Sequence, residues 1–581
     1  MDFESLLPRV IKPARYTDGE WNAVHKDPAH VRARFVLIYP DAYEVGMSHL
    51  GLQILYHVLN SHPDFLAERA FAPWPDMGRQ LREHGLPLTS LESRTPLREF
   101  DVVGITLPYE LTYANILSVL DLAGIPLRSA DRGADDPLVI AGGPGAVNPE
   151  AMADFFDAIL IGEGEEAILE IAEAAALPDR AAALERLAEI PGMYVPANYD
   201  ASFEGPGPAG SVTPRNGAPS RIERRFVADL DAAPFPTRQI VPFLDTVHSR
   251  VTLEIMRGCA RGCRFCQAGP AYRPRRERSV ETLLRQAEEA IAATGYDEVS
   301  LLAFTSVDHR DIEQLVAELV ARFGDRGVGV ALPSLRADAF SVALANKIQQ
   351  VRKSGLTFAP EAGSPRLRQV IRKQVTEDDL FAAADAAFSS GWTRLKLYFM
   401  IGLPTETDED VEAIADLVQR LVAFGRGALG SRAGRLRIAV SIASFVPKPH
   451  TPFQWLGQEA RDALLHRQHL LQQGLRGRAI KLSWTDPEVS ALEAAISRGD
   501  RRIGRAIEGA WRLGAAFDAW GEHFDFGRWQ QAFQQADLDL EDYANRVLDY
   551  RDPLPWDHIS CGVEKSALQR EAEAALGGEE A

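Results

Sequence analysis

Three of the four cysteines in this chain of 581 residues lie within a single short run, which constrains the fold more than any other feature. Cys259, Cys263 and Cys266 are spaced C-x3-C-x2-C, and Gly258 and Gly262 stand beside the first two. Thiolates so close together in a turn-prone loop can converge on one metal centre, and an iron–sulfur cluster is the usual occupant of such a run. With three local ligands, a [4Fe-4S] cluster keeps one iron open for a small molecule.

Two other uses of these cysteines are considered. A structural zinc site usually has four protein ligands, so zinc would need a distant fourth ligand such as His309, His450 or Cys561. A disulfide framework is disfavoured because one pair with leftover cysteines does not staple a chain of this length. The low cysteine content indicates a reducing compartment.

The CxxxCxxC run, with the aromatic Phe265 directly before its last cysteine, resembles the signature of the radical S-adenosylmethionine (radical SAM) enzymes. The resemblance implies that Cys259, Cys263 and Cys266 hold a [4Fe-4S] cluster whose open iron binds S-adenosyl-L-methionine. It also implies that an electron from the cluster cleaves the sulfonium to give a 5'-deoxyadenosyl radical. The flanking sequence is most similar to radical SAM proteins with a cobalamin (B12)-binding domain, a subgroup in which many substrates are not established.

Composition limits the remaining possibilities. The length predicts three or four domains, and 46% hydrophobic with 25% charged residues is ordinary for a globular protein. No apolar run is long enough to span a membrane, and the first residues lack the basic start of a signal peptide, which predicts a cytoplasmic protein without a membrane partner. The net charge of -19 argues against nucleic-acid binding over the whole surface, although a local basic patch is compatible with it.

The N-terminal part alternates between predicted strands and helices. Apolar strand candidates lie at 35–39, 101–107, 137–141 and 158–161, with helical spacing between several of them. Such alternation predicts a doubly wound α/β domain over residues 1–200, in which helices wrap a parallel sheet and ligands bind at the carboxyl ends of the strands.

This part resembles the Rossmann-like cobalamin-binding domain that precedes many radical SAM cores. Glycine at the strand ends would let the backbone approach a bulky corrin. The sequence contains no Asp-x-His-x-x-Gly motif and His49 lacks that spacing, so cobalamin is expected to bind without a protein histidine ligand. The alternative is a domain that has kept the shape and lost the cofactor. The cobalamin-binding residues implied by the resemblance are Leu50, Gly51, Gly142, Gly143, Gly162 and Glu163.

A linker is predicted over residues 201–245, because segment 204–220 is rich in Gly and Pro and has almost no apolar bulk. A second series of strands and helices follows over residues 246–460. The resemblance makes this series a partial (β/α)6 TIM barrel, open on one side, that forms the radical SAM core. Its predicted strands are 251–256, 298–304, 327–332, 356–359, 394–400 and 436–441.

Residues at successive strand ends match the positions where the family binds S-adenosylmethionine. Thr305 and Ser306 would meet the methionine amino group, although the more usual Gly-Gly-Glu is absent, and Glu361 has the acceptors for a ribose diol. Phe265 would flank adenine beside the cluster. The resemblance implies the following set: Phe265, Thr305, Ser306, Ser334, Arg336, Glu361, Gly402 and Pro404.

Two residues are candidate catalytic side chains. Lys396 lies on an otherwise apolar strand, where it either points into the barrel mouth or pairs with a nearby carboxylate. Cys561, in the terminal loop 554–563, is a fourth cluster ligand, a proton or hydrogen donor, or a small buried hydrophobic residue. The proline-rich segment 444–455 is predicted to lie on the substrate side of the core.

The last part of the chain, residues 461–581, is predicted to form a helical cap and tail. Its basic run 498–505 indicates either a solvated helix start or a site for an acidic or phosphate-bearing substrate. Beyond Glu571 the tail is acidic and is predicted to fray.

These features together predict a radical SAM enzyme that reductively cleaves S-adenosylmethionine, with cobalamin for methylation or rearrangement of its substrate. The resemblance implies a flavodoxin or ferredoxin as reductant. RNA, a peptide or an acidic metabolite are all compatible substrates. The alternatives are a hydrogen-abstracting radical SAM enzyme with a vestigial cobalamin domain, and a non-enzymatic iron–sulfur or cofactor sensor.

Overall fold

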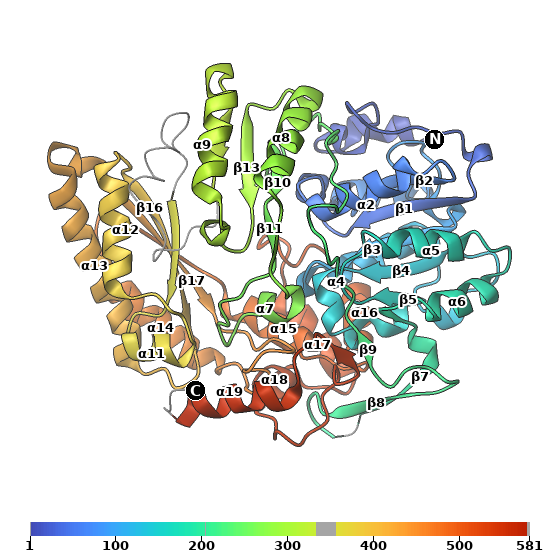
Figure 1. Cartoon of the computed structure of the whole chain (residues 1–581). Coiled ribbons are helices and arrows are strands. Elements are labelled where there is room, and N and C mark those ends of the chain that lie inside the picture. The colour runs from blue at the N-terminus through green and yellow to red at the C-terminus, as the bar shows by residue number, and fades with distance from the viewer. Residues whose placement is uncertain (1, 204, 333–355, 578–581) are drawn as a thin grey trace.

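The computed structural model describes residues 2–203, 205–332 and 356–577. An N-terminal α/β domain and a barrel-like core lie side by side, and the C-terminal helices run beneath both of them (Figure 1). The predicted fold class, a doubly wound N-terminal domain followed by a partial barrel and a helical region, is confirmed.

The N-terminal sheet has the strand order β2-β1-β3-β4-β5-β6, and its pairs are parallel except for that between β5 and β6. In sheets of this order, ligands bind outside the carboxyl ends of β1 and β3, where the strand order reverses. The strands are β1 (Ala33–Tyr39), β2 (Phe65–Phe71), β3 (Val102–Thr106), β4 (Leu138–Gly142), β5 (Ala158–Leu160) and β6 (Met193–Tyr194).

Strand β2 was not predicted, because Glu68 and Arg69 interrupt its apolar run. Both are buried, and Arg69 forms ion pairs with Glu92 at 2.6 Å and with Glu20 at 2.5 Å. Buried charges are tolerated when they are paired in this way. The edge of the sheet is therefore held by a charge network that hydrophobic periodicity cannot reveal.

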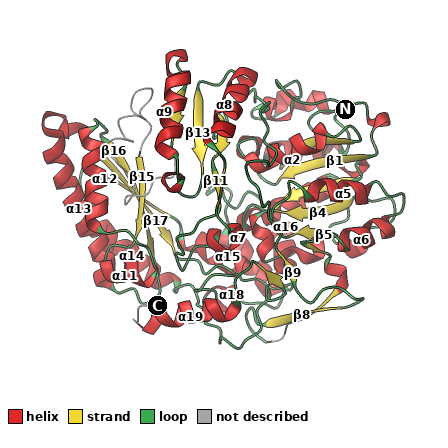
Figure 2. Cartoon of the chain, in the orientation of Figure 1, coloured by secondary structure: helices red, strands yellow, loops and turns green. Residues whose placement is uncertain are grey.

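Helices cover both faces of this sheet (Figure 2). Helices α2 (Leu50–Ser61) and α5 (Ala167–Ala175) contribute to one hydrophobic cluster. On the other face α4 (Tyr113–Leu122) packs against α16 (Ile503–Arg512), and α17 (Phe526–Gln535) joins the same cluster. The C-terminal helices therefore complete the helical layer of the N-terminal domain.

The described part of the core contains seven parallel strands in two sheets, of order β10-β13-β14 and β15-β16-β17-β18. Within the described residues no ladder joins the two sheets, so the barrel is not closed. Strand β18 lies in the region predicted to be helical and adds a strand to the six expected. The strands are β10 (Val251–Glu254), β13 (Glu298–Leu302), β14 (Gly329–Ala331), β15 (Leu356–Glu361), β16 (Arg394–Ile401), β17 (Arg437–Ser444) and β18 (Ile480–Trp484).

The outer layer of the core is helical, and strand side chains alternate between it and the barrel interior. On β16, Leu395 and Leu397 are buried in the cluster that contains the helix residues, whereas Lys396 and Tyr398 are partly exposed on the opposite, inner face. The outer helices are α8 (Val280–Thr294), α9 (Ile312–Phe323), α12 (Glu377–Ser389), α13 (Asp408–Leu429) and α14 (Arg461–Gly474).

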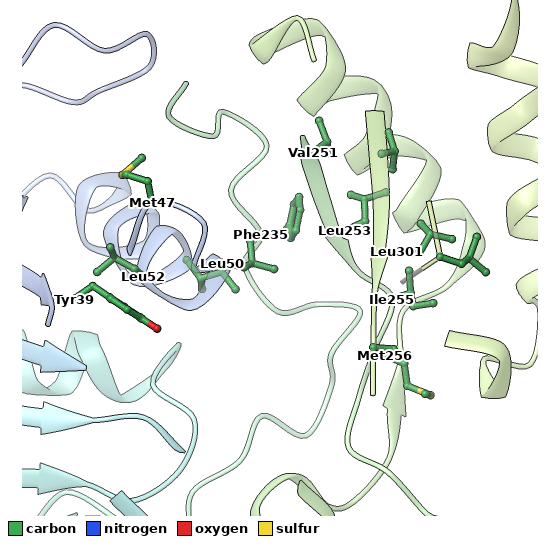
Figure 3. Packing of buried hydrophobic residues seen from close by; sticks show 14 of the residues in the cluster. Tyr39, Met47, Leu50, Leu52, Phe235, Val251, Leu253, Ile255, Met256 and Leu301 are labelled. Atoms are coloured by element: carbon green, nitrogen blue, oxygen red, sulfur yellow. The ribbon is translucent and has the colours of Figure 1, made fainter. Parts of the chain in front are cut away.

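Apolar packing joins the two units. Phe235 lies between Leu50 on α2 and the strand residues Val251 and Leu253 (Figure 3), and all four belong to one buried cluster. The segment predicted as a linker also contains two short strands: β8 (Gly210–Pro214) pairs with β7 (Tyr199–Phe203), and β9 (Ile222–Glu223) pairs with β19 (Ile559–Ser560). The segment 204–220, predicted as part of a linker, therefore contains strand β8 at residues 210–214.

Residues 572–577 are helical, although fraying was expected beyond Glu571. Helix α19 (Lys565–Gly577) continues past Glu571 and packs against α11 (Pro365–Val370). Leu568, Ala572 and Ala575 are buried on its inner face. Nowhere in the described ranges does a helix have both the length and the apolar character needed to cross a bilayer.

Candidate active site

The cysteine loop lies between β11 (Met256–Arg257) and α7 (Ala268–Tyr272), at the carboxyl end of the first barrel strand. Gly258 has a φ of +85°, and a Cβ at this position would lie 2.5 Å from the carbonyl oxygen of Tyr272. Only glycine fits this close approach. The backbone N–H of Cys266 donates to the carbonyl of Cys263 at 3.1 Å, which closes the turn between the last two cysteines.

The three thiols are partly exposed on this loop. Burial raises the pKa of Cys266, and the charge of Cys259 adds to the effect. Among the described residues no three His, Cys, Asp or Glu side chains are grouped closely enough to form a metal site. The loop therefore supplies three sulfur donors that would have to turn toward one another and lose their protons when a cluster binds.

The histidines considered as distant zinc ligands are held elsewhere. His309 is hydrogen-bonded through Nε2 to the carbonyl of Arg278 at 2.9 Å, and His450 through Nε2 to the carbonyl of Val147 at 2.9 Å. Neither imidazole joins the cysteine loop in a group of potential ligands. These positions give no support to the zinc alternative.

Arginine side chains fix the cysteine loop to its surroundings. Arg261 donates through Nε to Asp308 at 3.0 Å, and Arg264 donates through Nε to Glu571 at 3.0 Å. Arg264 also donates to the carbonyl of Val370 at 3.0 Å. The turn that carries Cys263 and Cys266 is thus tied to the C-terminal helix α19.

The residues predicted to bind S-adenosylmethionine lie at the strand ends that follow the cysteine loop. Thr305 is buried and its hydroxyl has no hydrogen-bond partner among the described residues, whereas the Ser306 hydroxyl donates to the carbonyl of Leu301 at 3.2 Å. Glu361, at the end of β15, has a φ of +70° and forms an ion pair with Lys373 at 3.0 Å. Oxygen atoms of Thr305 and Glu361 therefore lie at the strand ends where S-adenosylmethionine is predicted to bind. The hydroxyl of Ser306, in contrast, already bonds to the backbone.

Of the other residues predicted to bind S-adenosylmethionine, some make contacts within the fold and two fall outside the described residues. Gly402 has a φ of +77° and donates its N–H to Glu406 at 2.6 Å, which shapes the turn that contains Pro404. Phe265 packs against a small buried cluster that includes Leu403 and Phe445. Ser334 and Arg336 lie outside the described residues.

A cavity of about 580 Å³ separates the N-terminal sheet from the cysteine loop. Its N-terminal side is formed by residues at the carboxyl ends of the strands and at the start of α2, and its other side by residues flanking the cysteine loop and following β13. All six residues predicted for cobalamin line it: Leu50, Gly51, Gly142, Gly143, Gly162 and Glu163. The core contributes Met256, Arg257, Ala271, Tyr272, Leu302 and Phe304.

Glu163 takes part in a buried charge network at the cavity wall. It pairs with Arg257 at 3.0 Å and with Arg276 at 2.7 Å, and Arg257 also pairs with Glu165 at 2.6 Å. Burial alone would raise the pKa of Glu163, but the hydrogen bond and charge of Arg276 and the charge of Arg257 hold this pKa below its ordinary value. This network links the N-terminal domain to the cysteine-loop side of the core.

His49 also lines the cavity, where it acts as a helix cap. Its Nδ1 accepts a hydrogen bond from the N–H of Leu52 at 3.1 Å, at the start of α2. Burial lowers the pKa of His49 to about 4, so the imidazole is neutral near pH 7. The same nitrogen cannot both cap the helix and bind a metal.

The two candidate catalytic residues lie on different elements, Lys396 on β16 and Cys561 directly after β19. Lys396 donates to the hydroxyl of Tyr398 at 2.6 Å and precedes Gly402 by six positions, which is about 20 Å along an extended strand. Its partner is thus a phenol on the inner barrel face. Cys561 is buried against Val147 and Ala271, behind the cavity wall, and burial raises its pKa to about 12.

An aromatic pair in the cavity was not predicted. The rings of Tyr272 and Phe304 lie 5.0 Å apart, one after the cysteine loop and the other after β13, and 45% of the Phe304 surface is exposed. An aromatic residue directly after a barrel strand was the only available signal in the sequence. The pair forms part of the wall between the cavity and the core.

In the proline-rich segment, predicted to lie on the substrate side, and in the basic run, for which a solvated helix start was the alternative, several charged side chains have internal partners. Lys448 of the proline-rich segment pairs with Glu110 at 2.8 Å and Glu493 at 2.9 Å, joining three distant parts of the chain. In the basic run, Arg498 is buried and bonded to backbone carbonyls, and Arg501 pairs with Glu150 at 3.0 Å. These two arginines therefore have internal partners, whereas Arg505 of the same run is exposed.

Two family models match this chain. One, described as radical SAM proteins, N-terminal, covers residues 51–196, and the other, described as the radical SAM superfamily, covers residues 253–418 and includes the cysteine run. The chain belongs to the radical SAM superfamily. The predicted family is thereby confirmed, together with the prediction that the chain is an enzyme.

Two curated relatives are similar to this radical SAM protein. An uncharacterized protein of Methanocaldococcus jannaschii is 26% identical over 475 residues, which cover 81% of this chain and 90% of the relative. An uncharacterized methyltransferase of Pyrococcus horikoshii is 25% identical over 298 residues, which cover 49% of this chain and 59% of the relative.

Two solved structures show the same fold. TsrM from Kitasatospora setae, a radical S-adenosylmethionine methyltransferase with cobalamin and a [4Fe-4S] cluster bound, has a TM-score of 0.51 at 14% identity, covering 87% of this chain and 99% of that one. OxsB, a cobalamin-dependent S-adenosylmethionine radical enzyme with aqua-cobalamin and S-adenosylmethionine bound, has a TM-score of 0.50 at 12% identity, covering 94% of this chain and 78% of that one. At sequence identities this low, the similarity of the structures shows a shared fold and nothing about function.

Proposed function

We propose that this radical SAM protein binds cobalamin between its two domains and transfers a methyl group to its substrate. The observation that carries the proposal is the cavity of about 580 Å³, which reaches from the glycine-rich strand ends to the residues flanking the three cysteines. A volume of this size is within the range of cofactor sites. A group bound there would lie next to the cysteine loop.

The residues around the cavity fit a large, flat and mostly apolar cofactor. Gly142 ends β4 at the cavity, and a Cβ added there would touch only Leu160, at 3.8 Å, so the backbone faces open space. Ile54, Ile140 and Leu160 supply apolar contact area. His49 lines the same cavity and caps α2 through Nδ1.

The cysteine loop fits a [4Fe-4S] cluster through its donor chemistry. Cys259, Cys263 and Cys266 would hold the cluster, and the Thr305 hydroxyl and Glu361 carboxylate provide polar atoms at neighbouring strand ends for S-adenosylmethionine. When bound, the cluster supplies the electron that cleaves S-adenosylmethionine, and cobalamin supplies methyl-transfer chemistry. The chain's own part is to hold the two sites beside each other and to limit access of water.

The comparisons support methyl transfer over rearrangement. One relative carries the name methyltransferase, and the TsrM structure is that of a methyltransferase. We propose a flavodoxin or ferredoxin as the electron donor. Arg498 and Arg501 of the basic run have internal partners and would not be available to an anionic substrate.

The proposal can be tested by filling the cavity. We expect Gly142→Leu to abolish corrinoid binding, because its side chain would extend from a position with room for a Cβ into the cavity. Gly133→Leu is the matched control, since a Cβ at Gly133 meets nothing within 4 Å and Gly133 does not line the cavity. Corrinoid content would be measured from the absorption spectrum of anaerobically purified protein, together with iron content as a check on the cysteine loop.

Loss of corrinoid in Gly142→Leu, with iron retained and with normal binding in Gly133→Leu, would support the proposal. Transfer of an isotope-labelled methyl group from S-adenosylmethionine to a product would then establish the reaction class. Wild-type protein with an intact cluster and no corrinoid would refute cobalamin binding. Such protein would instead be expected to abstract hydrogen atoms and release 5'-deoxyadenosine.

A further inference from the structure

Arginines are concentrated beside the cysteine loop. Segment 273–278 contains four of them in six residues. Arg276 and Arg278 point inward and are buried, whereas the side chain of Arg275 is 40% exposed. Two further arginines lie close to it: the side chain of Arg310 is 75% exposed and that of Arg261 is 30% exposed.

The carboxylates that pair with these arginines lie underneath them. The Glu277 side chain is 10% exposed and pairs with Arg275 at 3.4 Å and with Arg310 at 3.0 Å. The Asp308 side chain is also 10% exposed and pairs with Arg261. Because these two acids are covered and the guanidinium groups lie outermost, the ion pairs present positive charge to solvent.

This positive surface is continuous with the cysteine loop. Arg261 stands between Cys259 and Cys263 in the sequence, and Arg273 donates through Nε to the carbonyl of Cys259 at 3.2 Å. A Cβ placed on Gly262 would lie 3.7 Å from Arg273 Nη2 and 3.9 Å from Arg372 Nη1. We call Arg261, Arg273, Arg275, Arg310 and Arg372 the arginine rim.

The rim contrasts with the chain as a whole, whose net charge is -19. A local positive surface attracts the acidic face of a partner at short range, even though the protein as a whole is acidic. A cluster held by these cysteines would lie close to the rim, because Arg261 belongs to the cysteine loop and Arg273 is hydrogen-bonded to it, and electron transfer into the cluster requires such proximity.

We infer that the arginine rim is the docking surface for an acidic protein that carries single electrons. In each encounter the reduced carrier is oxidised by one electron and the cluster is reduced by one electron, and no bond forms or breaks. The inference rests on the proposed function only in requiring a cluster at the three cysteines. It does not require that cobalamin is bound.

The test reverses charge at two rim residues whose shared ion-pair partner, Glu277, lies outside the cysteine loop. We expect Arg275→Glu with Arg310→Glu to slow reduction of the cluster by fully reduced flavodoxin about tenfold or more at low ionic strength. Rising salt should slow the wild-type reaction and should have little effect on the variant. Reduction by photoreduced deazaflavin, a small molecule that needs no docking surface, should be unchanged within about twofold.

A matched control carries the same charge change at distant positions. Arg186 and Arg551 are 52% and 91% exposed in their side chains and pair with nearby carboxylates, as the rim arginines do. Arg186→Glu with Arg551→Glu should reduce as fast as the wild type with both reductants. This control separates a local effect from the change in total charge.

Several outcomes would overturn the inference. Equal slowing with flavodoxin and with deazaflavin would mean that the rim only maintains the cysteine loop, and unchanged reduction by flavodoxin would mean that the carrier docks elsewhere. If flavodoxin reduces the rim variant normally and the variant no longer binds a single-stranded RNA that the wild type binds, the rim is a nucleic-acid site. If wild-type protein lacks corrinoid and the rim variant still shows the flavodoxin defect, the proposed methyl transfer fails and the docking surface stands.

Discussion

Replacement of Glu571 by alanine tests whether helix α19 holds the cysteine loop in place. Glu571 accepts hydrogen bonds from Arg264 at 3.0 Å and from Arg372 at 2.6 Å. The side chain of Arg264 is only 7% exposed, so removing its carboxylate partner leaves a buried cation with two backbone carbonyls as its other acceptors. The side chain of Arg372 is 41% exposed, and its pair with Glu571 contributes less.

The magnitude follows from these exposures. Breaking a fully buried ion pair costs about 3–5 kcal/mol. Glu571 is 28% exposed, and Arg264 keeps its carbonyl acceptors, so we expect a loss of about 2 kcal/mol, in the range of a hydrogen bond to a charged group. A loss of this size raises the population of the undocked helix about 30-fold.

Hydrogen–deuterium exchange measures this population directly at the amides of α19 and of the cysteine loop. In Glu571→Ala both segments should exchange faster by a similar factor. Under anaerobic conditions, a chelator should also remove iron from this variant sooner than from the wild type. Glu571→Gln should show a smaller effect on both measurements. Glu573→Ala is the control, because Glu573 is exposed and bonds only to Gln569 among the contacts observed. Faster exchange in α19 alone, with an unchanged cysteine loop, would refute the coupling.

Three further predictions concern the loop, the domain junction and pH. Gly258→Ala should prevent cluster assembly, measured as iron per protein, because its Cβ would lie 2.5 Å from the carbonyl of Tyr272 at a φ of +85°. Glu163→Gln should weaken the association of the two domains by about 2–3 kcal/mol, measured as faster proteolysis between residues 201 and 245, because it leaves the buried Arg276 without its carboxylate. His450 has a pKa lowered to about 4 by burial, so its contribution to stability is present above pH 6.5 and is lost as pH falls toward 4. His450→Gln should reduce the fall in the thermal midpoint over that interval, and an unchanged pH dependence would contradict this assignment.

The sequence was sufficient to predict the features that depend on local pattern. The cysteine run identified the family because its spacing is itself the signal, and the glycines at the ends of β4 and β5 predicted which residues line the cavity. Strand β2 was missed because its buried charges hide the apolar run, and β18 was missed because amphipathic helices surround it.

The failures at the candidate site have a common physical cause. Whether an arginine or a lysine is free depends on partners far away in the sequence, and no local pattern reveals them. Lys448 has partners at Glu110 and Glu493, and Glu571 has partners at Arg264 and Arg372. The proline-rich segment and the acidic tail therefore have structural roles that composition alone could not show.

The packing of C-terminal helices on the N-terminal sheet has a consequence for biosynthesis. On one face of that domain α16 packs against α4, and α17 packs against α16; both helices leave the ribosome more than three hundred residues after the last strand of the domain. At a synthesis rate of about 5–20 residues per second, the apolar surface that they cover stays exposed for roughly 15–70 seconds. The nascent N-terminal domain is therefore a natural client for chaperones, and its excision as a separate module would leave the same face permanently exposed.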